Sequence, residues 1–260
     1  MHADLGGKVA VVTGSSRGIG RAIAEAFTVA GARVWFHGSS EEGRRVADAV
    51  GQTFVPADFT SADEVRAMAD TIARQEKRLD ILVNNAGVEP IMPLEAMDWA
   101  KYDACFNVNV RAAVQLTTSL LPLLKIAGAS GGGGGASVIN ITSIHDSVPY
   151  PQNAVYSMTK AALNMFTKAA AVELAPHGVR VNSLAPGAIE TDINREVIDK
   201  IGREKFAEWI PAGRVGTVDE VVGPAMFLAS DAASYVTGAT LYADGADRHN
   251  LVRYRPEGHD

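Results

Sequence analysis

Short apolar runs rich in β-branched residues alternate along the chain with longer segments of helical periodicity. The short runs predict strands at residues 9–13, 34–36, 53–56, 81–83, 137–142, 179–183 and 240–242. The periodic segments predict helices at residues 19–30, 41–50, 61–75, 99–124, 154–174 and 218–228. Because strands that alternate with helices pair in parallel through right-handed crossovers, the pattern predicts an α/β fold, a single doubly wound parallel sheet with helices on both faces.

The pattern runs on without an interdomain linker, so residues 1–246 are expected to form a single domain. Residues 131–135 are five consecutive glycines, and the entropy lost on ordering them predicts a flexible surface loop. Residues 247–260 are a polar C-terminal tail. A polar terminus is commonly disordered. The family resemblance described below implies the alternative of contact with a neighbouring subunit, which the apolar Leu251, Val252 and Tyr254 favour.

The composition is that of an ordinary globular protein, with 47% hydrophobic residues, 21% charged residues and a net charge of −6. Acidic and basic residues are interleaved, which argues against nucleic acid or an anionic membrane as a partner. No apolar run reaches the roughly 18 residues that span a bilayer, and the first residues lack the pattern of a signal peptide. The one cysteine, Cys105, cannot form an internal disulfide. We therefore expect a cytoplasmic protein with a small-molecule partner and no metal site.

A glycine-rich turn joins the first predicted strand to the first predicted helix. Gly14, Gly18 and Gly20 permit a tight turn and let a pyrophosphate approach the helix N-terminus, where free amide groups and the helix dipole favour negative charge. The spacing is G-x-x-x-G-x-G rather than G-x-G-x-x-G, and no Gly-Lys-Ser/Thr follows as in a nucleoside triphosphatase. The turn therefore predicts a dinucleotide site.

The residues after the second predicted strand bear on which dinucleotide is bound. An acidic residue there usually grips the ribose 2′-hydroxyl of NAD, but in this chain no acid occurs before Glu41. Arg17, Ser39 and Ser40 could instead contact a 2′-phosphate. This favours NADP as the cofactor, with NAD as the alternative. In the other interpretation of Ser39 and Ser40, the two serines only cap the helix that follows.

Tyr156 and Lys160 stand four residues apart at the start of a predicted helix, so their side chains share one face. Such a pair is weak evidence alone, but Ser143 stands where the preceding strand ends, at the edge where a doubly wound sheet binds ligands. A phenol with a free pKa of about 10 needs positive charge nearby to act as a base. Lys160 and an oxidised nicotinamide would supply that charge, and Ser143 would hold the substrate oxygen. The three residues predict proton transfer at Tyr156.

Together these motifs resemble the short-chain dehydrogenase/reductase family, in its subtype of roughly 250 residues. The match includes T-G-x-x-x-G-x-G at 13–20, N-N-A-G at 84–87, Asn109, Ser143, Y-x-x-x-K at 156–160, Pro186-Gly187 and Thr191. The resemblance implies a Rossmann fold, an NAD(P)-dependent oxidoreductase and a homotetramer. The predicted domain would then both bind the dinucleotide and carry the catalytic residues.

The resemblance also gives roles to residues that spacing alone does not single out. It implies that Asn109 helps to hold Lys160 and an ordered water, so that the catalytic set is Asn109, Ser143, Tyr156 and Lys160. It implies a cofactor-binding set of Gly14, Ser16, Arg17, Gly18, Ile19, Gly20, Ser39, Ser40, Asp58, Asn85, Gly87, Tyr156, Lys160, Pro186, Gly187, Ile189 and Thr191. Asp58 would lie at the adenine, and Ile189 and Thr191 near the nicotinamide carboxamide. Without the family, Asn109 could be a polar residue on a helix surface and Thr191 a helix cap.

The segments expected around the substrate carry polar and aromatic side chains, and they resemble the loops of bacterial glucose 1-dehydrogenases. A polyhydroxylated substrate needs several hydrogen-bond donors and acceptors, so the resemblance implies a sugar or polyol as substrate. The expected substrate residues are Glu89, Ser143, His145, Tyr150 and Asn194. In the alternative interpretation, His145 bonds local backbone and Glu89 is an ordinary solvated loop residue.

Two other functions remain open. A 3-oxoacyl-[acyl-carrier-protein] reductase has the same catalytic residues, but it needs a basic patch for its acidic carrier, and Arg111 and Lys168 form no evident one. A catalytically silent, cofactor-sensing protein would keep the fold without needing the intact catalytic set. By its position in the family pattern, the stretch at residues 197–210 is expected to form an amphipathic lid over the pocket, with Gly202 and Gly213 as possible pivots.

Overall fold

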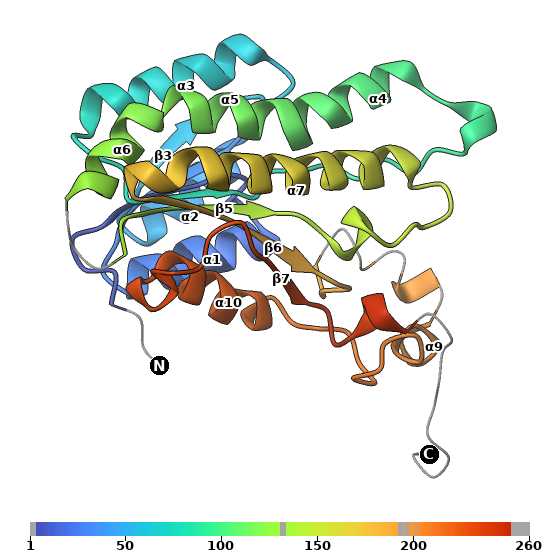
Figure 1. Ribbon diagram of the computed structural model, residues 1–260. Coiled ribbons are helices and arrows are strands. Elements are labelled where there is room, and N and C mark those ends of the chain that lie inside the picture. Colours follow the sequence, from blue (N-terminus) through green and yellow to red (C-terminus); the bar gives the residue numbers. More distant parts are fainter. Residues whose placement is uncertain (1–3, 131–133, 192–194, 196–197, 201, 251–260) are drawn as a thin grey trace.

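The centre of the molecule is a parallel sheet, seen in a computed structural model that describes residues 4–130, 134–191, 195, 198–200 and 202–250. Within these residues the sheet has seven strands in the order β3-β2-β1-β4-β5-β6-β7 (Figure 1). The strands are β1 (Val9–Val12), β2 (Arg33–Gly38), β3 (Thr53–Pro56), β4 (Ile81–Asn84), β5 (Ala136–Ile141), β6 (Val179–Pro186) and β7 (Thr240–Ala243). The central strands β1, β4, β5 and β6 are buried along their whole length, which explains why they read as nearly continuous apolar runs.

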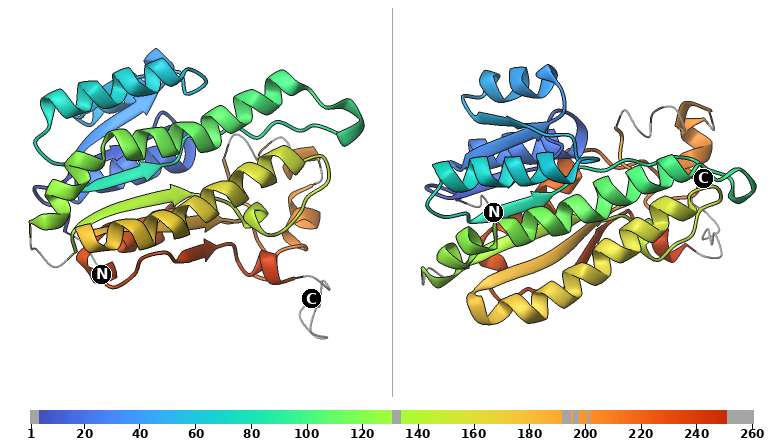
Figure 2. Two further views of the ribbon diagram at one scale, coloured as in Figure 1. Left: turned by 45° about the horizontal axis from the view of Figure 1, so that its top comes forward. Right: turned by 90° about the horizontal axis from the view of Figure 1, so that it is seen from above.

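Helices cover both faces of the sheet (Figures 1 and 2). One face carries α3 (Ala62–Gln75), α5 (Ala112–Ser119), α6 (Leu121–Ala129) and α7 (Ala154–Leu174), and the other carries α1 (Gly18–Val29), α2 (Glu41–Ala49) and α10 (Asp219–Ala229). Each face has its own buried apolar cluster, with Met68 and Leu116 in the first and Phe27 and Leu228 in the second. The predicted doubly wound α/β fold is confirmed.

The winding of the chain reverses between β1 and β4. From β1 the chain winds outward through β2 and β3, then returns to place β4 on the other side of β1. Val12 is in register with both Phe36 and Val83, so the segments that follow these strands leave the sheet at one level. Doubly wound sheets bind ligands in the crevice that such a reversal creates.

The predicted helix at residues 99–124 is interrupted in the structure. It consists of α4 (Trp99–Phe106), a π-helical turn at Asn107–Arg111, and α5, and after a break at Leu120 it continues as α6. Pro122 in the first turn of α6 has no N–H to extend the helix before it, which accounts for the break. Of the described helices none is long and apolar enough to cross a membrane by itself, and only the bent pair Trp99–Ser119 and Leu121–Ala129 passes that test of length and composition.

The glycine run differs from its prediction where the structure describes it, at Gly134 and Gly135. Gly134 is buried, and a Cβ there would collide with Asp231. Gly135 has a φ of 61°, and a Cβ there would collide with the Gly178 carbonyl oxygen. For these two residues the flexible surface loop is wrong, because the backbones approach too closely for any side chain. Residues 131–133 lie outside the described residues.

The predicted lid and tail are described only in part. Helix α9 (Arg203–Ala207) lies within the predicted lid, and Phe206 packs against a small cluster around Ile210. The tail begins with a 3₁₀ turn at Asp247–His249, and Asn250 Nδ2 donates a 2.9 Å hydrogen bond to the carbonyl oxygen of Trp209. Residues 197, 201 and 251–260 lie outside the described residues, so Leu251 and Tyr254 do as well.

Candidate active site

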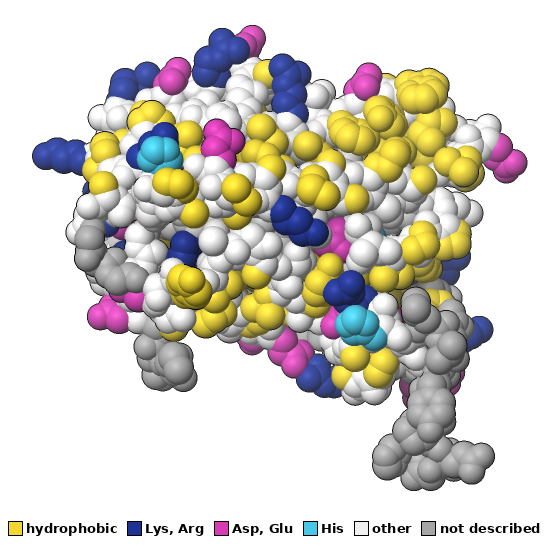
Figure 3. Space-filling view, in the orientation of Figure 1, with side chains coloured by type: hydrophobic (Ala, Val, Ile, Leu, Met, Phe, Trp, Pro, Cys, Tyr) yellow, Lys and Arg dark blue, Asp and Glu magenta, His cyan; other side chains and the backbone are white. Residues whose placement is uncertain are grey.

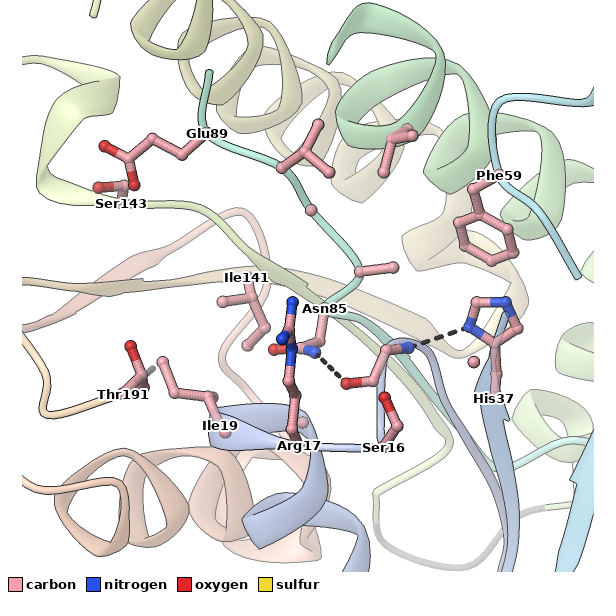
Figure 4. Close-up of a pocket in the computed structure, with 18 of the residues that line it drawn as sticks. Ser16, Arg17, Ile19, His37, Phe59, Asn85, Glu89, Ile141, Ser143 and Thr191 are labelled. Atoms are coloured by element: carbon pink, nitrogen blue, oxygen red, sulfur yellow. Dashed lines mark hydrogen bonds between the residues drawn. The ribbon is translucent and has the colours of Figure 1, made fainter. Parts of the chain in front are cut away.

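A pocket of about 400 Å³ opens where the segments after β1, β4 and β5 meet the end of β6 (Figure 4). Most of the predicted cofactor residues line it: Gly14, Ser16, Arg17, Gly18, Ile19, Gly20, Ser39, Asp58, Asn85, Gly87, Tyr156, Lys160, Pro186, Gly187, Ile189 and Thr191. Of the predicted substrate residues, Glu89 and Ser143 line the same pocket. Figure 4 shows these two at one end and His37 with Phe59 at the other, so a single elongated cavity joins the predicted catalytic and cofactor ends.

Among the described residues, four predicted site residues do not line this pocket. Ser40 occupies the N-cap position of α2, and its side chain makes no cap hydrogen bond there. Asn109 is buried behind the pocket wall, and His145 and Tyr150 lie together near it, with ring centroids 5.7 Å apart. Asn194 lies outside the described residues.

The glycine turn is held from both sides at Gly14. Its N–H donates to His37 Nδ1 at 3.0 Å, and its carbonyl oxygen accepts from Asn85 Nδ2 at 3.1 Å (Figure 4). Helix α1 then begins at Gly18 with no acidic residue in its first turn, and the preceding Arg17 makes no side-chain cap hydrogen bond. A Cβ at Gly20 would collide with the Gly14 carbonyl and the Asn85 amide. The turn is thus a close-packed cradle whose amide groups and dipole suit an anion.

The far end of the pocket is lined by the segment after β3. Asp58 Oδ1 accepts 2.8 Å hydrogen bonds from the backbone N–H and the hydroxyl of Thr60, and these bonds lower the pKa of Asp58. Phe59 follows, with its ring stacked on the imidazole of His37. Ser39 and Arg17 line the pocket as well, and among the described residues after β2 the first acid is Glu41 in α2.

Lys160 and Tyr156 lie on one face of α7, where Lys160 is buried and Tyr156 is half-buried. Lys160 Nζ lies 5.4 Å from the centroid of the Tyr156 ring and donates a 2.9 Å hydrogen bond to the Ile141 carbonyl oxygen at the end of β5. Burial lowers the pKa of Lys160 to about 8, against the opposing charge of Glu89. The ammonium of this lysine is therefore held at the pocket by its bond to the end of the strand.

The phenol of Tyr156 is less acidic in this pocket than the sequence led us to expect. Burial raises the pKa of Tyr156 well above its usual value, the negative charge of Glu89 adds to the rise, and a hydrogen bond with Ser143 opposes it. We expected the charge of Lys160 to lower the pKa of this phenol, and the protein groups alone do not produce that result. The expectation overlooked the desolvation of Tyr156 and the carboxylate of Glu89.

Asn109 sits on the π-helical turn, a distortion that often marks functional sites. Its Nδ2 donates to the Val88 carbonyl at 2.9 Å and to Thr159 Oγ1 at 3.0 Å, while its Oδ1 accepts from the Val88 N–H at 2.8 Å. A Cβ placed on Gly87 would meet both Asn109 Oδ1 and Lys160 Nζ within 3.5 Å, so the amide and the ammonium approach each other across this glycine. Asn109 thus joins the segment after β4 to α7.

The loop after β5 orients the predicted substrate residues. Ser143 Oγ accepts a 3.2 Å hydrogen bond from the His145 N–H, and His145 Nδ1 lies 2.9 Å from the Val148 carbonyl oxygen. A carbonyl can only accept, so Nδ1 carries a hydrogen and Nε2 is the ring nitrogen that this bond does not use. Asp146 anchors the loop by accepting from Asn164 Nδ2 and the Tyr242 hydroxyl. His145 therefore bonds local backbone, as its alternative interpretation has it, and its Nε2 takes no part in that bond.

Several pocket residues were not predicted from the sequence: His37, Gly38, Ala57, Phe59, Thr60, Ala86, Val88, Val108, Ile141 and Thr142. His37 had the clearest signal, because it stands at the carboxyl end of a predicted strand, beside the residues expected at the cofactor. Phe59 and Thr60 directly follow Asp58, so the family resemblance that places Asp58 at the adenine could have indicated them as well. Among the described residues, no group of three or more His, Cys, Asp or Glu side chains could hold a metal ion.

The comparisons with known proteins cover nearly the whole chain. A family model described as "Enoyl-(Acyl carrier protein) reductase" matches residues 14–245. The chain is 38% identical to 3beta-hydroxysteroid dehydrogenase 1 of Eggerthella lenta, with 94% of this chain and 95% of that protein covered. It is 35% identical to glucose 1-dehydrogenase 2 of Bacillus subtilis, with 94% and 96% covered. It is 36% identical to a 3-oxoacyl-[acyl-carrier-protein] reductase of Aquifex aeolicus, with 94% and 99% covered.

Among solved structures, a gluconate 5-dehydrogenase from Burkholderia cenocepacia J2315, in complex with NADP and tartrate, superposes with a TM-score of 0.86. The two sequences are 34% identical, and the match covers 95% of this chain and 97% of that one. The likeness thus extends to the whole architecture as well as to the short motifs.

Proposed function

The chain belongs to the short-chain dehydrogenase/reductase family and is an NAD(P)-dependent oxidoreductase. We propose that it uses NADP(H) to interconvert an alcohol and a carbonyl group of a sugar or polyol. The observation that carries the proposal is the single pocket that joins the glycine cradle at Gly14 to Tyr156, Lys160 and Ser143. Glu89 at the same end supplies a polar wall for hydroxyl groups. The resemblance read from the sequence is thereby confirmed at the level of the family.

The pocket fits a phosphorylated dinucleotide. The cradle of the glycine turn would hold the pyrophosphate at the N-terminus of α1. Arg17 and Ser39 would face a 2′-phosphate, with no acidic residue before Glu41 to repel it. The gluconate 5-dehydrogenase that shares the fold was solved with NADP, which supports the same choice here. When bound, the nicotinamide supplies the hydride acceptor or donor.

The protein groups supply the proton and hold the substrate. The Ser143 hydroxyl, at hydrogen-bonding distance from Tyr156, would bind the reacting oxygen and present it to the phenol. In the reductive direction neutral Tyr156 would donate its proton to that oxygen, which its raised pKa allows. In the oxidative direction the phenol must lose its proton, and the positive charges of Lys160 and of the oxidised cofactor would stabilise the phenolate. Asn109 would hold the segment of Val88 and the start of α7 in register around this reaction.

The proposed substrate class follows from the polar groups near Tyr156. Glu89 accepts from Asn153 Nδ2 and can accept from a substrate hydroxyl as well. In a neutral ring His145 Nε2 would offer a second acceptor, and the ring of Tyr150 would close that side. A carboxylate at position 89 would repel an anionic substrate, so a neutral aldose or polyol suits this pocket better than a sugar acid. The glucose 1-dehydrogenase relative supports this choice.

The test is a panel of aldoses, polyols, hydroxysteroids and oxoacyl thioesters, assayed with NADP(H) and NAD(H). The proposal requires turnover of a neutral sugar or polyol with the best kcat/KM in the panel, and a higher kcat/KM with NADP(H) than with NAD(H). A preference for oxoacyl thioesters would favour the reductase alternative, which the Aquifex aeolicus relative supports. Cofactor binding without turnover of any member would favour a catalytically silent, cofactor-sensing protein.

We also propose a cytoplasmic homotetramer. Large apolar side chains are exposed on α4 and α7, among them Trp99 at 68%, Met165 at 63% and Val172 at 80% (Figure 3). Large exposed apolar side chains that gather on a helix layer can mark contacts between subunits. Cys105 is a buried free thiol, which suits a reducing compartment. Light scattering during gel filtration would test the subunit number, and a monomer at micromolar concentration would contradict it.

A further inference from the structure

His37 lies at the opposite end of the pocket from Ser143, with its ring turned toward the glycine turn (Figure 4). The residue is 3% exposed, and its ring stacks on Phe59 with centroids 4.1 Å apart and planes inclined by 21°. Nδ1 lies 3.0 Å from the Gly14 nitrogen, and Nε2 lies 3.1 Å from the Ala57 carbonyl oxygen. Three contacts on two segments, one after β1 and one after β3, thus leave the imidazole one orientation.

The two hydrogen-bond partners also decide the protonation of this ring. The Ala57 carbonyl can only accept, so Nε2 must carry a hydrogen. The Gly14 N–H can only donate, so Nδ1 must be bare. Only the neutral Nε2–H tautomer satisfies both neighbours, and burial supports the neutral form by lowering the pKa of His37 to about 4. The imidazole is therefore a fixed acceptor aimed at the first glycine of the turn.

We propose that His37 is a positioning residue for cofactor binding, because its bare Nδ1 holds the Gly14 amide in the geometry in which the turn receives the pyrophosphate. The inference rests on the proposed function, since it requires that this pocket binds NADP(H). His37 acts through the turn and is not itself assigned a contact with the reacting atoms.

The remaining contacts of the turn show why one acceptor matters. Gly14 has a φ of 63°, and its carbonyl is held by Asn85 on the side opposite His37. The next residue pairs with the same histidine through its backbone: Ser15 N donates to the His37 carbonyl at 2.8 Å, and His37 N donates to Ser15 Oγ at 2.9 Å. Without the Nδ1 acceptor, the Gly14 N–H would lose its partner just before the amides that face the anion. The turn would then have to be ordered at the expense of cofactor affinity.

Two truncations of the ring separate this role from packing. In His37→Asn the side-chain oxygen can take the place of Nδ1 and accept from Gly14, while the bond to Ala57 is lost. In His37→Gln the side-chain amide reaches toward Ala57, and no acceptor takes the place of Nδ1. Both variants lose the stack on Phe59, so each is the control of the other. The measurements are the Kd for NADPH by fluorescence titration, the KM for NADPH, kcat at saturating NADPH, and the melting temperature.

We expect H37Q to bind NADPH about tenfold more weakly than H37N, the factor that corresponds to one lost hydrogen bond to a buried amide. The KM for NADPH should follow the Kd, and kcat at saturation should agree between the two variants. Equal affinities in H37N and H37Q, with NADPH binding by the wild type intact, would overturn the role of His37 and leave the proposed function standing. No binding of NADPH by the wild-type protein would instead overturn the proposed function. If H37Q melts far below H37N, a double-mutant cycle that combines each variant with Asn85→Asp decides the question. The proposal requires that the effects of the His37 and Asn85 substitutions on the Kd for NADPH are not additive, because both side chains bond to Gly14. Additive effects would overturn it.

Discussion

Glu89 Oε1 accepts a 2.5 Å hydrogen bond from Asn153 Nδ2, which ties a carboxylate in the segment after β4 to the residue that precedes α7, the helix of Tyr156. The charge of Glu89 raises the pKa of both Tyr156 and Lys160. A single loop carboxylate is therefore coupled to the two residues proposed to handle the proton.

Replacing Glu89 by Gln should shift the pH dependence of alcohol oxidation toward lower pH. Loss of the negative charge lowers the pKa of Tyr156, so the phenolate needed for oxidation forms at lower pH. We expect the rising limb of the kcat profile to move down by about one pH unit. Glu89→Asp, which keeps the charge, is the control. A limb that stays in place in E89Q would mean that the charge of Glu89 is screened from Tyr156.

Tyr156→Phe should remove turnover while leaving cofactor binding nearly unchanged. The phenol hydroxyl is the proton donor and acceptor of the proposed reaction, and a positioned acid–base group contributes about 10²-fold to 10⁴-fold to a rate. The ring that remains still fills its half-buried site between Lys160 and the loop of Ser143. Steady-state kcat and the Kd for NADPH are the two measurements. As a comparison, Tyr102→Phe changes a tyrosine of α4 that packs among aromatic rings outside the pocket and should keep the wild-type rate. Turnover in Y156F within tenfold of wild type would assign the proton to another group.

Much of the fold follows from local patterns, because the central strands are buried on both faces and the helices carry one apolar face each. Helix α7 was predicted with both of its ends, and the helix predicted at residues 19–30 differs from α1 by one residue at each end. The interrupted helix around Asn109 could not be read in this way. Its π turn accompanies hydrogen bonds to Val88, 21 residues earlier in the chain, and local periodicity carries no trace of such contacts.

In the candidate site, too, the residues in local motifs were predicted and the contacts between distant parts of the chain were not. Residues in contiguous motifs, such as those of the glycine turn, were placed in the pocket by their neighbours in the sequence. The effect of Glu89 on Tyr156 and the contact of His37 with Gly14 join residues that are far apart in the sequence, and they depend on how loops pack at the edge of the sheet. Burial of Tyr156 likewise requires the folded surroundings, so the direction of its pKa shift could not be predicted from residue types.

Arg180 is a structural arginine whose removal should destabilise the fold. The side chain is buried and donates to the carbonyl oxygens of Gly134, Leu228 and Ser230, at distances of 2.9 to 3.1 Å. It thereby satisfies carbonyls at the C-terminus of α10 and places positive charge at the negative end of the helix dipole. Arg180→Met would remove all three hydrogen bonds and the buried charge. The Leu228 and Ser230 carbonyls would keep their bonds from the Ser137 hydroxyl and the Ala233 N–H, while the Gly134 carbonyl would lose the donor that Arg180 supplies. We expect a loss of about 2–4 kcal/mol in the free energy of unfolding by urea.

Arg66→Met is the matched control for this measurement. Arg66 is exposed and pairs with Asp63 three residues away on α3, so its loss should cost less than about 1 kcal/mol. Similar stabilities of R180M and R66M would show that solvent or neighbouring groups replace the hydrogen bonds of Arg180.

His37 should also make the folding stability depend on pH between its unfolded and folded pKa. The pKa of His37 falls from 6.5 to about 4 on folding, because burial disfavours the charged ring more strongly than the Ala57 carbonyl favours it. Above both values the ring is neutral in either state, and its contribution to stability is fully present. As the pH drops from 6.5 toward 4, the unfolded chain takes up a proton that the folded protein excludes, so stability is lost. The loss from this one residue between about pH 7.5 and about pH 5 amounts to about 2 kcal/mol.

In the variant His37→Asn, position 37 carries no group that titrates in this range, while every other histidine and carboxylate is kept. The difference in stability between the wild type and this variant therefore isolates the contribution of His37. Urea unfolding of both proteins at the two pH values gives the comparison. The wild type should lose about 2 kcal/mol more than H37N on acidification, even if H37N is less stable at neutral pH. Equal losses in the two proteins would mean that the folded ring takes up a proton as readily as the unfolded one. The imidazole could not then be confined to the neutral tautomer that the Gly14 N–H and the Ala57 carbonyl require.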